Sequence, residues 1–203
     1  MFASTLQSMS SAELDALVSD VKKGDTAKYG LIVDGLQQPI YRYCCQLLND
    51  RHEAEDAVQD ILVKAFQAIH QYESKMNFSA WIYRIAHNHC LNLLRKRRVH
   101  MQVMRLFRPN MTAESPEQLM DSRMYNSELQ GALLQLTAEE RSLLILRVFE
   151  EKSYAEISKI MNLSPNAITK RMMRIKKKMQ KLIMLKEEMN WSDIKKLQPN
   201  SEI

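Results

Sequence analysis

The stretch from Ser153 to Lys178 constrains the fold of this chain more than any other. Ser153 and Glu156 form a capping-box pattern, which predicts the start of a first short helix. Asn162 can end that helix, because asparagine tolerates the left-handed conformation that helix C-termini often need. Ser164-Pro165 then supplies an N-cap and a first helical residue for a second helix. Two short helices around a tight turn predict a helix-turn-helix.

The second helix of this motif has a basic outer face. Ile168, Met172 and Ile175 recur at spacings of four and three and predict its apolar side. The side chains that face elsewhere are the candidate contacts to duplex DNA: Thr169, Lys170, Arg171, Met173 and Arg174. From position 157 to 186 there are nine Lys or Arg and no Asp or Glu. A merely soluble helix usually mixes both signs, so we favour DNA binding over an ordinary solvated hairpin.

Composition favours an all-α chain. Only four Gly and five Pro occur in 203 residues, and no strongly alternating strand pattern stands out. Hydrophobic residues make up 45% of the chain, which is ample for packed cores. We predict two small helical domains joined by a flexible linker, the second containing the helix-turn-helix. The expected boundaries are 11–99, a linker 100–126, 127–186, and a tail 187–203 of undetermined role.

The chain offers no sign of a membrane span. No apolar run approaches the required length, and residues 1–10 lack the basic start and apolar core of a signal peptide. We therefore expect a cytoplasmic protein without membrane insertion.

Neither the cysteines nor the histidines predict a metal site. Cys44, Cys45 and Cys90 are odd in number and have no C-x-x-C spacing, so buried thiols are the expectation. His87 and His89 would point about 200° apart on a helix and could not share an ion. The sequence also contains no nucleophile-base pair and no phosphate-binding glycine loop. We predict no catalytic residue, metal or cofactor.

Charge is distributed in blocks. Residues 74–113 contain eight Lys or Arg and no acid, whereas residues 49–73 contain six acids and two bases. Separate basic and acidic patches imply a polyanion and a second, different partner.

The helix predicted for 51–70 is the clearest in the first half. Its core stripe is predicted to be Ala54, Val58, Ile61, Leu62, Ala65, Phe66 and Ile69. Its outward polar edge is Glu53, Asp56, Gln59 and Asp60. From the residue pattern alone a solvated face is favoured over a docking surface. The neighbouring predicted helices are one from about 10 that Gly24 ends, then 26–36, 39–49 and 79–98.

Aromatic and basic residues interleave after position 71. Tyr72, Phe78, Trp81 and Tyr83 stand beside Arg84, His87, Asn88 and Asn92. This mixture suits stacking on unpaired bases while cations hold phosphates. Most of these aromatics could equally belong to a core.

Several ordered motifs resemble those of the extracytoplasmic-function sigma factors, two-domain specificity subunits of bacterial RNA polymerase. The resemblance covers about Ser11 to Lys181 and rests on Glu55-Asp-Ala-Val-Gln-Asp60, Phe78-x-x-Trp81-Ile-Tyr-Arg-Ile-Ala-x-Asn88, Leu136-Thr-x-Glu-Glu-Arg141, Tyr154-Ala-Glu-Ile157 and the helix-turn-helix. One departure is Pro165-Asn166-Ala167, where the family commonly has Val-Gly-Thr. The −35 sequence preference is therefore not transferable.

The resemblance implies the role of each surface. It makes the edge with Asp56, Gln59 and Asp60 a docking site for the β′ coiled coil of core polymerase, with the β flap as a second polymerase contact. It assigns the second helix of the helix-turn-helix to the −35 major groove. It assigns recognition and melting of the −10 element to Tyr72, Asn77, Phe78, Trp81, Arg84 and Asn88. An anti-sigma factor is a candidate further partner, although no residue identifies one.

Two other classes of protein fit the sequence less well. A helix-turn-helix regulator that acts on duplex DNA without polymerase would account for Ser153 to Lys178, but would leave the aromatic-basic block without a purpose. An enzyme acting on nucleic acid lacks a plausible active site.

Overall fold

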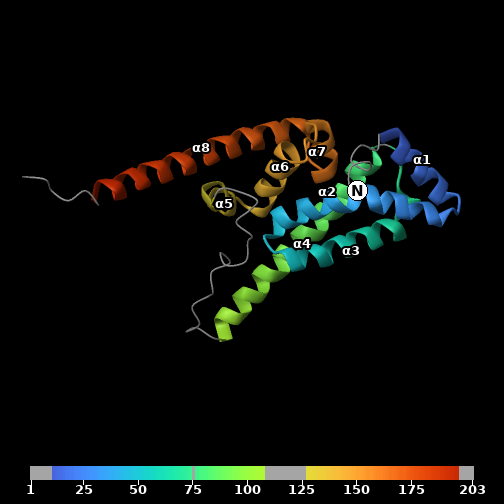
Figure 1. Ribbon diagram of the computed structural model, residues 1–203, viewed down its shortest axis with the longest axis horizontal. Coiled ribbons are helices and arrows are strands. Elements are labelled where there is room, and N and C mark those ends of the chain that lie inside the picture. The colour runs from blue at the N-terminus through green and yellow to red at the C-terminus, as the bar shows by residue number, and fades with distance from the viewer. Residues whose placement is uncertain (1–10, 75, 108–126, 197–203) are drawn as a thin grey trace, which may run out of the picture.

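Every regular element in the described part of the chain is helical, which confirms the all-α prediction there (Figure 1). The computed structural model describes residues 11–74, 76–107 and 127–196. Its α-helices are α1 (Ser11–Lys22), α2 (Tyr29–Leu48), α3 (Arg51–Gln67), α4 (Phe78–Phe107), α5 (Ser127–Leu134), α6 (Ala138–Val148), α7 (Tyr154–Met161) and α8 (Pro165–Lys196). A 3-10 turn, Thr26–Lys28, precedes α2, and another, Ile69–Gln71, follows α3.

Helices α1 to α4 form the first of two groups. Helix α2 packs along α3, α3 along α4, and α1 contacts both α2 and α4. Their apolar faces meet in a core whose largest fully buried side chains are Ile32, Ile40, Tyr43, Leu47, Leu48, Ile61, Phe78, Ile82 and Tyr83.

Pro39 lies inside α2 and does not begin a new helix, so the prediction of separate helices at 26–36 and 39–49 was wrong. A proline in a helix interior loses one hydrogen bond and costs about 3 kcal/mol. Ile32, Leu36 and Ile40 are nevertheless buried on one continuous face that passes the proline. Burying each such side chain contributes roughly 1.5–3 kcal/mol, so the apolar face outweighs the proline.

Two side chains of α3 also differ from the prediction. Phe66 is 39% exposed and packs against the ring of Tyr29 in a tilted arrangement, with centroids 4.8 Å apart. It follows the buried Ala65 by one residue, and that step of about 100° carries it to the edge of the apolar stripe. Glu53, predicted to face outward, instead binds Arg97 of α4, because the basic end of α4 passes beside the start of α3.

Two helices run further than predicted. Helix α4 continues to Phe107, through the first part of the expected linker, and α8 continues to Lys196. The rest of the expected linker, 108–126, and the end of the tail, 197–203, lie outside the described residues.

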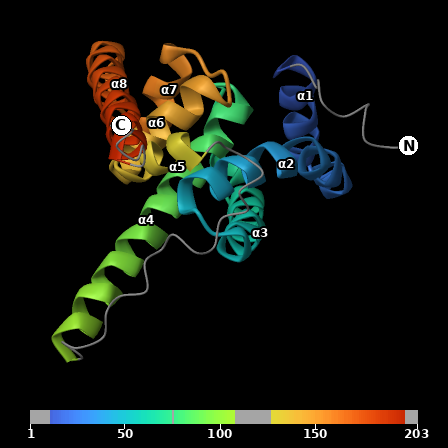
Figure 2. The ribbon, with the colours of Figure 1, turned by 60° about the vertical axis from the view of Figure 1, so that its left-hand side comes forward.

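Helices α5 to α8 form the second group. The predicted capping box at the start of α7, Ser153 paired to Glu156, is confirmed, and α6 begins with a second one, Thr137 paired to Glu140. Helix α8 packs on α5, α6 and α7. The two groups meet where α7 contacts α4 and where α6 contacts α2 and α4 (Figure 2).

Replacing Pro39 by alanine should stabilise the chain. Alanine restores the backbone N–H donor inside α2, and we expect the free energy of unfolding to rise by about 1–2 kcal/mol. Urea unfolding followed by circular dichroism measures the change. The exposed neighbour Gln38→Ala, which removes no constraint, should stay within about 0.5 kcal/mol of wild type. A destabilised Pro39→Ala chain would show that the proline suits its local geometry.

Candidate nucleic-acid and polymerase interfaces

Helices α7 and α8 form the predicted helix-turn-helix. Asn162 adopts the left-handed conformation after α7, with φ of 55°, as the sequence predicts. Ser164 accepts a hydrogen bond from the backbone N–H of Ala167 at 3.3 Å and so caps α8. The predicted apolar side of α8 is buried against the rest of its group through Ile168, Met172 and Ile175. The local pattern therefore places the opposite side of α8 toward solvent.

The predicted groove contacts are not equally available. Thr169, Lys170 and Arg174 are exposed, and Met173 is 58% exposed. Arg171 is half-buried, and its guanidinium donates to Glu139 of α6 at 3.2 Å. Arg171 is thus held by its own domain, and the Thr169 hydroxyl donates to the Pro165 carbonyl oxygen at 3.1 Å, whereas the exposed side chains of Lys170, Met173 and Arg174 can meet a groove.

Asn166 was missing from the predicted set. It is exposed in the first turn of α8, one turn before Lys170. Recognition helices contact base edges chiefly through their N-terminal residues, and asparagine can pair with adenine through two hydrogen bonds. The sequence signal for this residue was its position directly after Pro165, which marks the first turn of the helix.

The six predicted −10 residues separate into buried and exposed positions. Phe78 is fully buried and Tyr72 nearly so, and their rings pack 5.1 Å apart. Trp81 is half-buried and packs on both rings. Asn77 caps α4 by accepting from the backbone N–H of Ala80 at 2.7 Å. The rings of Tyr72, Phe78 and Trp81 therefore pack on one another below the surface of the loop and the first turn of α4, and are not fully exposed for stacking on bases.

Arg84 and Asn88 present the accessible part of the predicted −10 set. Both are exposed and, with Trp81, occupy positions i, i+3 and i+7 of α4. That spacing places the three on one face of the helix.

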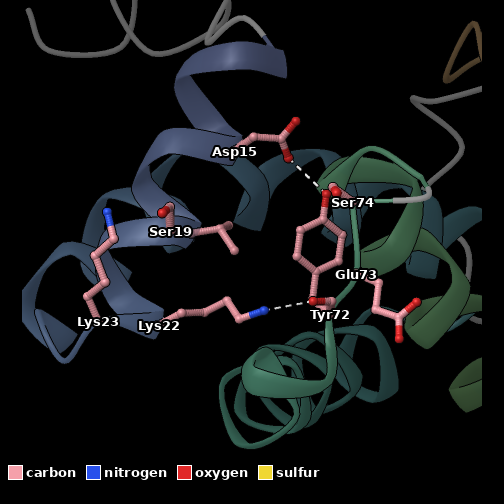
Figure 3. A pocket seen from close by; sticks show the side chains of 8 residues that line it. Asp15, Ser19, Lys22, Lys23, Tyr72, Glu73 and Ser74 are labelled. Atoms are coloured by element: carbon pink, nitrogen blue, oxygen red, sulfur yellow. Dashed lines mark hydrogen bonds between the residues drawn. The ribbon is translucent and has the colours of Figure 1, made fainter.

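A surface pocket of about 600 Å³ opens between α1 and the loop that follows the second 3-10 turn (Figure 3). The Tyr72 hydroxyl lies 2.9 Å from Asp15, and Lys22 donates to the Tyr72 carbonyl oxygen at 2.8 Å (Figure 3). These bonds fasten the loop to α1. Most of the residues that line it have polar side chains: Asp15, Val18, Ser19, Lys22, Lys23, Tyr72, Glu73 and Ser74.

The acidic edge of α3 is exposed. Asp56, Gln59 and Asp60 all face solvent, and Val63, one turn further on, is 55% exposed. Asp60 lies 3.8 Å from the imidazole of His89 on α4. The edge therefore combines negative charge with an apolar side chain that sequence reasoning did not include.

The basic end of α4 has both structural and free cations. Arg97 binds Glu53, and it also donates to the carbonyl oxygen of Leu48 at 3.3 Å. Arg95, Lys96 and Arg98 are exposed. Lys96 and Arg98 can therefore offer charge to a phosphate, and Arg95 can do so once it releases Asn92, to which it donates at 2.9 Å.

A buried polar cluster joins the two helical groups. The hydroxyl of Ser142 on α6 lies 2.8 Å from the Tyr43 hydroxyl of α2 and 2.8 Å from His87 Nδ1 of α4. Beside it, Arg141 donates to the Leu47 carbonyl oxygen at 3.2 Å. Burial lowers the pKa of His87 to about 4, although Glu139 opposes the shift. His87 is therefore neutral at pH 7, and its Nδ1 lies within hydrogen-bond distance of the hydroxyl groups of Tyr43 and Ser142.

His89, Cys44 and Cys90 each contact a neighbouring side chain of the fold. His89 faces α3, where the Lys64 ammonium lies 2.6 Å from its Nδ1, so it points away from His87. Cys44 and Cys90 are buried with their sulfurs 3.6 Å apart, and that contact and burial raise the pKa of the Cys44 thiol. Within the described residues, no three His, Cys, Asp or Glu side chains gather as a metal site requires. None of the described helices has the length and hydrophobicity of a membrane span.

Acid should weaken the fold through His87. Between pH 6.5 and about 4 the unfolded chain binds a proton that the folded chain does not, so stability falls as pH falls. Lowering the pH from about 7.5 to 5.0 should cost about 2 kcal/mol through this group. His87→Asn places an amide near the position of Nδ1 and cannot titrate. Between these two pH values its free energy of unfolding, measured with urea, should therefore fall by about 2 kcal/mol less than that of wild type. Equal losses in the two proteins would contradict the assignment.

Comparison with known proteins now identifies the two helical groups. Residues 32–99 match the family model for Sigma-70 region 2, and residues 126–179 match that for Sigma-70 region 4. The Bacillus subtilis ECF RNA polymerase sigma factor SigW is 28% identical over 174 residues, which are 81% of this chain and 93% of that protein. The RNA polymerase sigma-H factor of Pseudomonas aeruginosa is 29% identical over 177 residues, 82% of this chain and 92% of that protein.

Solved structures show the same fold. The sigma factor RpoE of Bartonella quintana, in complex with the anti-sigma factor NepR, superposes with a TM-score of 0.63 at 24% identity, covering 77% of this chain and 96% of RpoE. CnrH, in complex with the cytosolic domain of CnrY, gives a TM-score of 0.64 at 18% identity, covering 84% of this chain and 96% of CnrH. The resemblance inferred from the motifs is confirmed: the chain belongs to the extracytoplasmic-function sigma factors of the sigma-70 family, which bind core RNA polymerase and direct it to promoters.

Proposed function

We propose that this sigma factor divides promoter recognition between its two helical groups. Region 2, taken as residues 11–99, holds the melted −10 strand, and region 4, taken as residues 127–186, reads the −35 duplex. The single observation that carries the proposal is the exposed N-terminal half of α8, which presents Thr169, Lys170, Met173 and Arg174 on the side opposite its buried stripe. That is the geometry of a recognition helix in a major groove.

Arg84 and Asn88 are the proposed strand contacts on α4. Trp81, Tyr72 and Phe78 support that surface by packing beneath it. The pocket beside Tyr72 offers ammonium, hydroxyl and carboxylate groups at the loop that the family resemblance assigns to a flipped −10 base. Asn77 holds the same loop to the first turn of α4.

The acidic edge of α3 is the proposed docking surface for the polymerase β′ coiled coil. Asp56, Gln59 and Asp60 supply charge and hydrogen-bond acceptors, and Val63 adds an apolar contact. Polymerase performs the chemistry, and the sigma-factor family is generally non-enzymatic. We accordingly propose that this chain catalyses nothing itself and acts in the cytoplasm, beside the polymerase that it serves. An anti-sigma factor, such as the one bound to RpoE, is a candidate regulator of this chain too.

Opening promoter DNA requires binding free energy from both DNA-contacting surfaces and from the attachment of this chain to polymerase. Unstacking promoter DNA costs about 1.4 kcal/mol per base-pair step. Each base stacked or held in a pocket returns only about 1–3 kcal/mol. Phosphate contacts from both basic surfaces must supply the balance, so promoter binding should weaken steeply with salt.

Transcription in vitro tests the proposed function. Purified chain added to core polymerase should direct initiation from a subset of a promoter library that core alone does not transcribe. A regulator that acts without polymerase would bind duplex DNA and direct no initiation, and that result would overturn the proposal.

Asn88→Ala should impair promoter opening without affecting core binding. The side chain is exposed on α4 and is not part of the acidic edge of α3. We therefore expect the variant to lose a contact to the DNA strand and to keep its contacts to core polymerase. Permanganate reactivity of the melted region measures opening, and co-elution with core measures binding. Gln38→Ala, which removes an exposed amide from α2, is the control. Equal loss of opening and core binding would contradict the role of Asn88.

Arg174→Ala should relax −35 selectivity. A side chain that contacts a base edge contributes roughly 1–3 kcal/mol of discrimination, so single-base changes in the −35 element should matter about fivefold to a hundredfold less. Competition between wild-type and altered promoters measures this ratio. Arg171→Ala should have a smaller effect, because Arg171 is bound to Glu139. Unchanged promoter choice in Arg174→Ala would show that the groove assignment is wrong.

A further inference from the structure

The first turns of α8 present one continuous outer face. At about 100° per residue, the exposed side chains of this face fall within a sector of roughly 100° around the helix axis. They are Asn166, Lys170, Met173 and Arg174, and they lie opposite the buried stripe of α8. Helix α8 runs along the edge of the molecule, with these turns beside α7 (Figure 1). The face that a major groove would meet therefore begins at Asn166.

The fold leaves the side chain of Asn166 available for a base. Two neighbouring side chains on α8 are already bound. The Thr169 hydroxyl donates to the Pro165 carbonyl oxygen at 3.1 Å. The Arg171 guanidinium donates to Glu139 at 3.2 Å. Asn166 is exposed, and within the described part of the chain no hydrogen bond joins its side-chain amide to another residue.

The capped start of α8 fixes where the Asn166 side chain lies. Pro165 is the first residue of the helix, and the Ser164 hydroxyl accepts from the backbone N–H of Ala167 at 3.3 Å. Asn166 lies between these two residues, in the turn that recognition helices direct at base edges. The adjacent side chains of Pro165 and Ala167 are small, so the backbone of this turn can come close enough for a short side chain to reach a base.

The amide side chain matches adenine better than it matches the other three bases. Its carbonyl oxygen accepts and its NH2 group donates, so it pairs best with a donor and an acceptor next to each other on one base edge. In the major groove adenine presents N6–H2 beside N7, whereas guanine presents two acceptors. Cytosine presents a donor at N4, and thymine presents an acceptor at O4 beside a methyl group. Two hydrogen bonds from the amide to one base therefore form only at adenine.

The helix geometry places this adenine relative to the base that Arg174 reads. Eight residues separate Asn166 from Arg174, and at 1.5 Å per residue the two lie about 12 Å apart along the helix axis. Base pairs stack at about 3.4 Å, so a helix lying along the groove spans about three to four base pairs between the two side chains. The two contacts therefore fall on different base pairs of one short element.

We propose that Asn166 is a specificity-determining residue of this sigma factor, and that it reads an adenine of the −35 duplex within about four base pairs of the base read by Arg174. This inference rests on the proposed function, because α8 must enter the −35 major groove for either contact to form. It goes beyond the family resemblance, because the family commonly has glycine at this position and glycine has no side chain to read a base.

Transcription from a promoter library with a randomised −35 element tests the proposal. Core polymerase carrying the full wild-type chain should favour adenine at one −35 position over each other base by about fivefold to a hundredfold. Asn166→Ala should lose this preference and keep those at the other positions, because only one base contact is removed. Arg174→Ala should lose a different preference, at a position within about four base pairs. Gln180→Ala, which removes another exposed amide of α8 about 21 Å further along the helix, should keep both.

A modified base tests the contact at the level of single atoms. 7-Deazaadenine at the selected position lacks the N7 acceptor but still pairs with thymine. It should weaken promoter binding by polymerase carrying the wild-type chain about twofold to tenfold, because one hydrogen bond is lost. It should not weaken binding by polymerase carrying Asn166→Ala. Equal weakening of the two would show that Asn166 does not bind N7 and would overturn the proposal.

The remaining outcomes separate this inference from the proposed function. If Asn166→Ala weakens all promoters by the same factor, the side chain contacts a phosphate or supports the fold, and the proposal is overturned. An unchanged adenine preference, or loss of a preference for a different base, overturns it as well. These results leave the proposed function in place, because the wild-type chain still directs initiation. A wild-type chain that directs no initiation from any library member refutes the proposed function and this inference with it.

Discussion

The structure depends on one helix, α4, having three separate faces. Ile82 packs into the core with α1 to α3, Tyr83 and His87 meet region 4, and Arg84 and Asn88 face solvent. Successive residues of an α-helix are turned by about 100°, so neighbours in sequence can serve three different surfaces. Any shift in the rotation of α4 would change all three together. The capped start of the helix at Asn77 and the aromatic packing behind it hold that rotation.

Charge separates the partners of this sigma factor. Exposed acids, among them Asp56 and Asp60, lie on α3, and exposed cations lie on α8 and on the end of α4. Acids within the basic regions are neutralised locally, as Glu53 is by Arg97 and Glu139 is by Arg171. Polymerase and DNA can therefore be attracted to different surfaces of a small molecule at the same time.

Much of the fold could be predicted because its signals are local. A capping box needs only two side chains three residues apart, and the left-handed Asn162 needs only its own side chain. The family could be identified because its motifs occur in order along the chain. Predictions failed where distant contacts decided the outcome. The local sequence around Pro39 predicts the start of a helix. In the structure α2 continues past the proline, because its buried apolar face is continuous on both sides of it.

The candidate sites show the same division. Periodicity correctly separated the buried stripe of α8 from its outer face, but it could not show that Arg171 is bound by Glu139. Aromatic spacing marked Tyr72, Phe78 and Trp81 as one group, but it left core packing and base stacking equally open. Burial of Phe78 answers that question only once α1 to α4 are packed.

The sequence by itself determined the helices, their caps, the helix-turn-helix, the charge blocks and the family, because each depends on residues within a few turns or on motif order. Only the tertiary structure decided which side chains are free, which are already bound, and that Ser142 of region 4 joins Tyr43 and His87 of region 2 in one buried cluster. These three residues lie far apart in the chain, and no local pattern encodes a hydrogen bond between them.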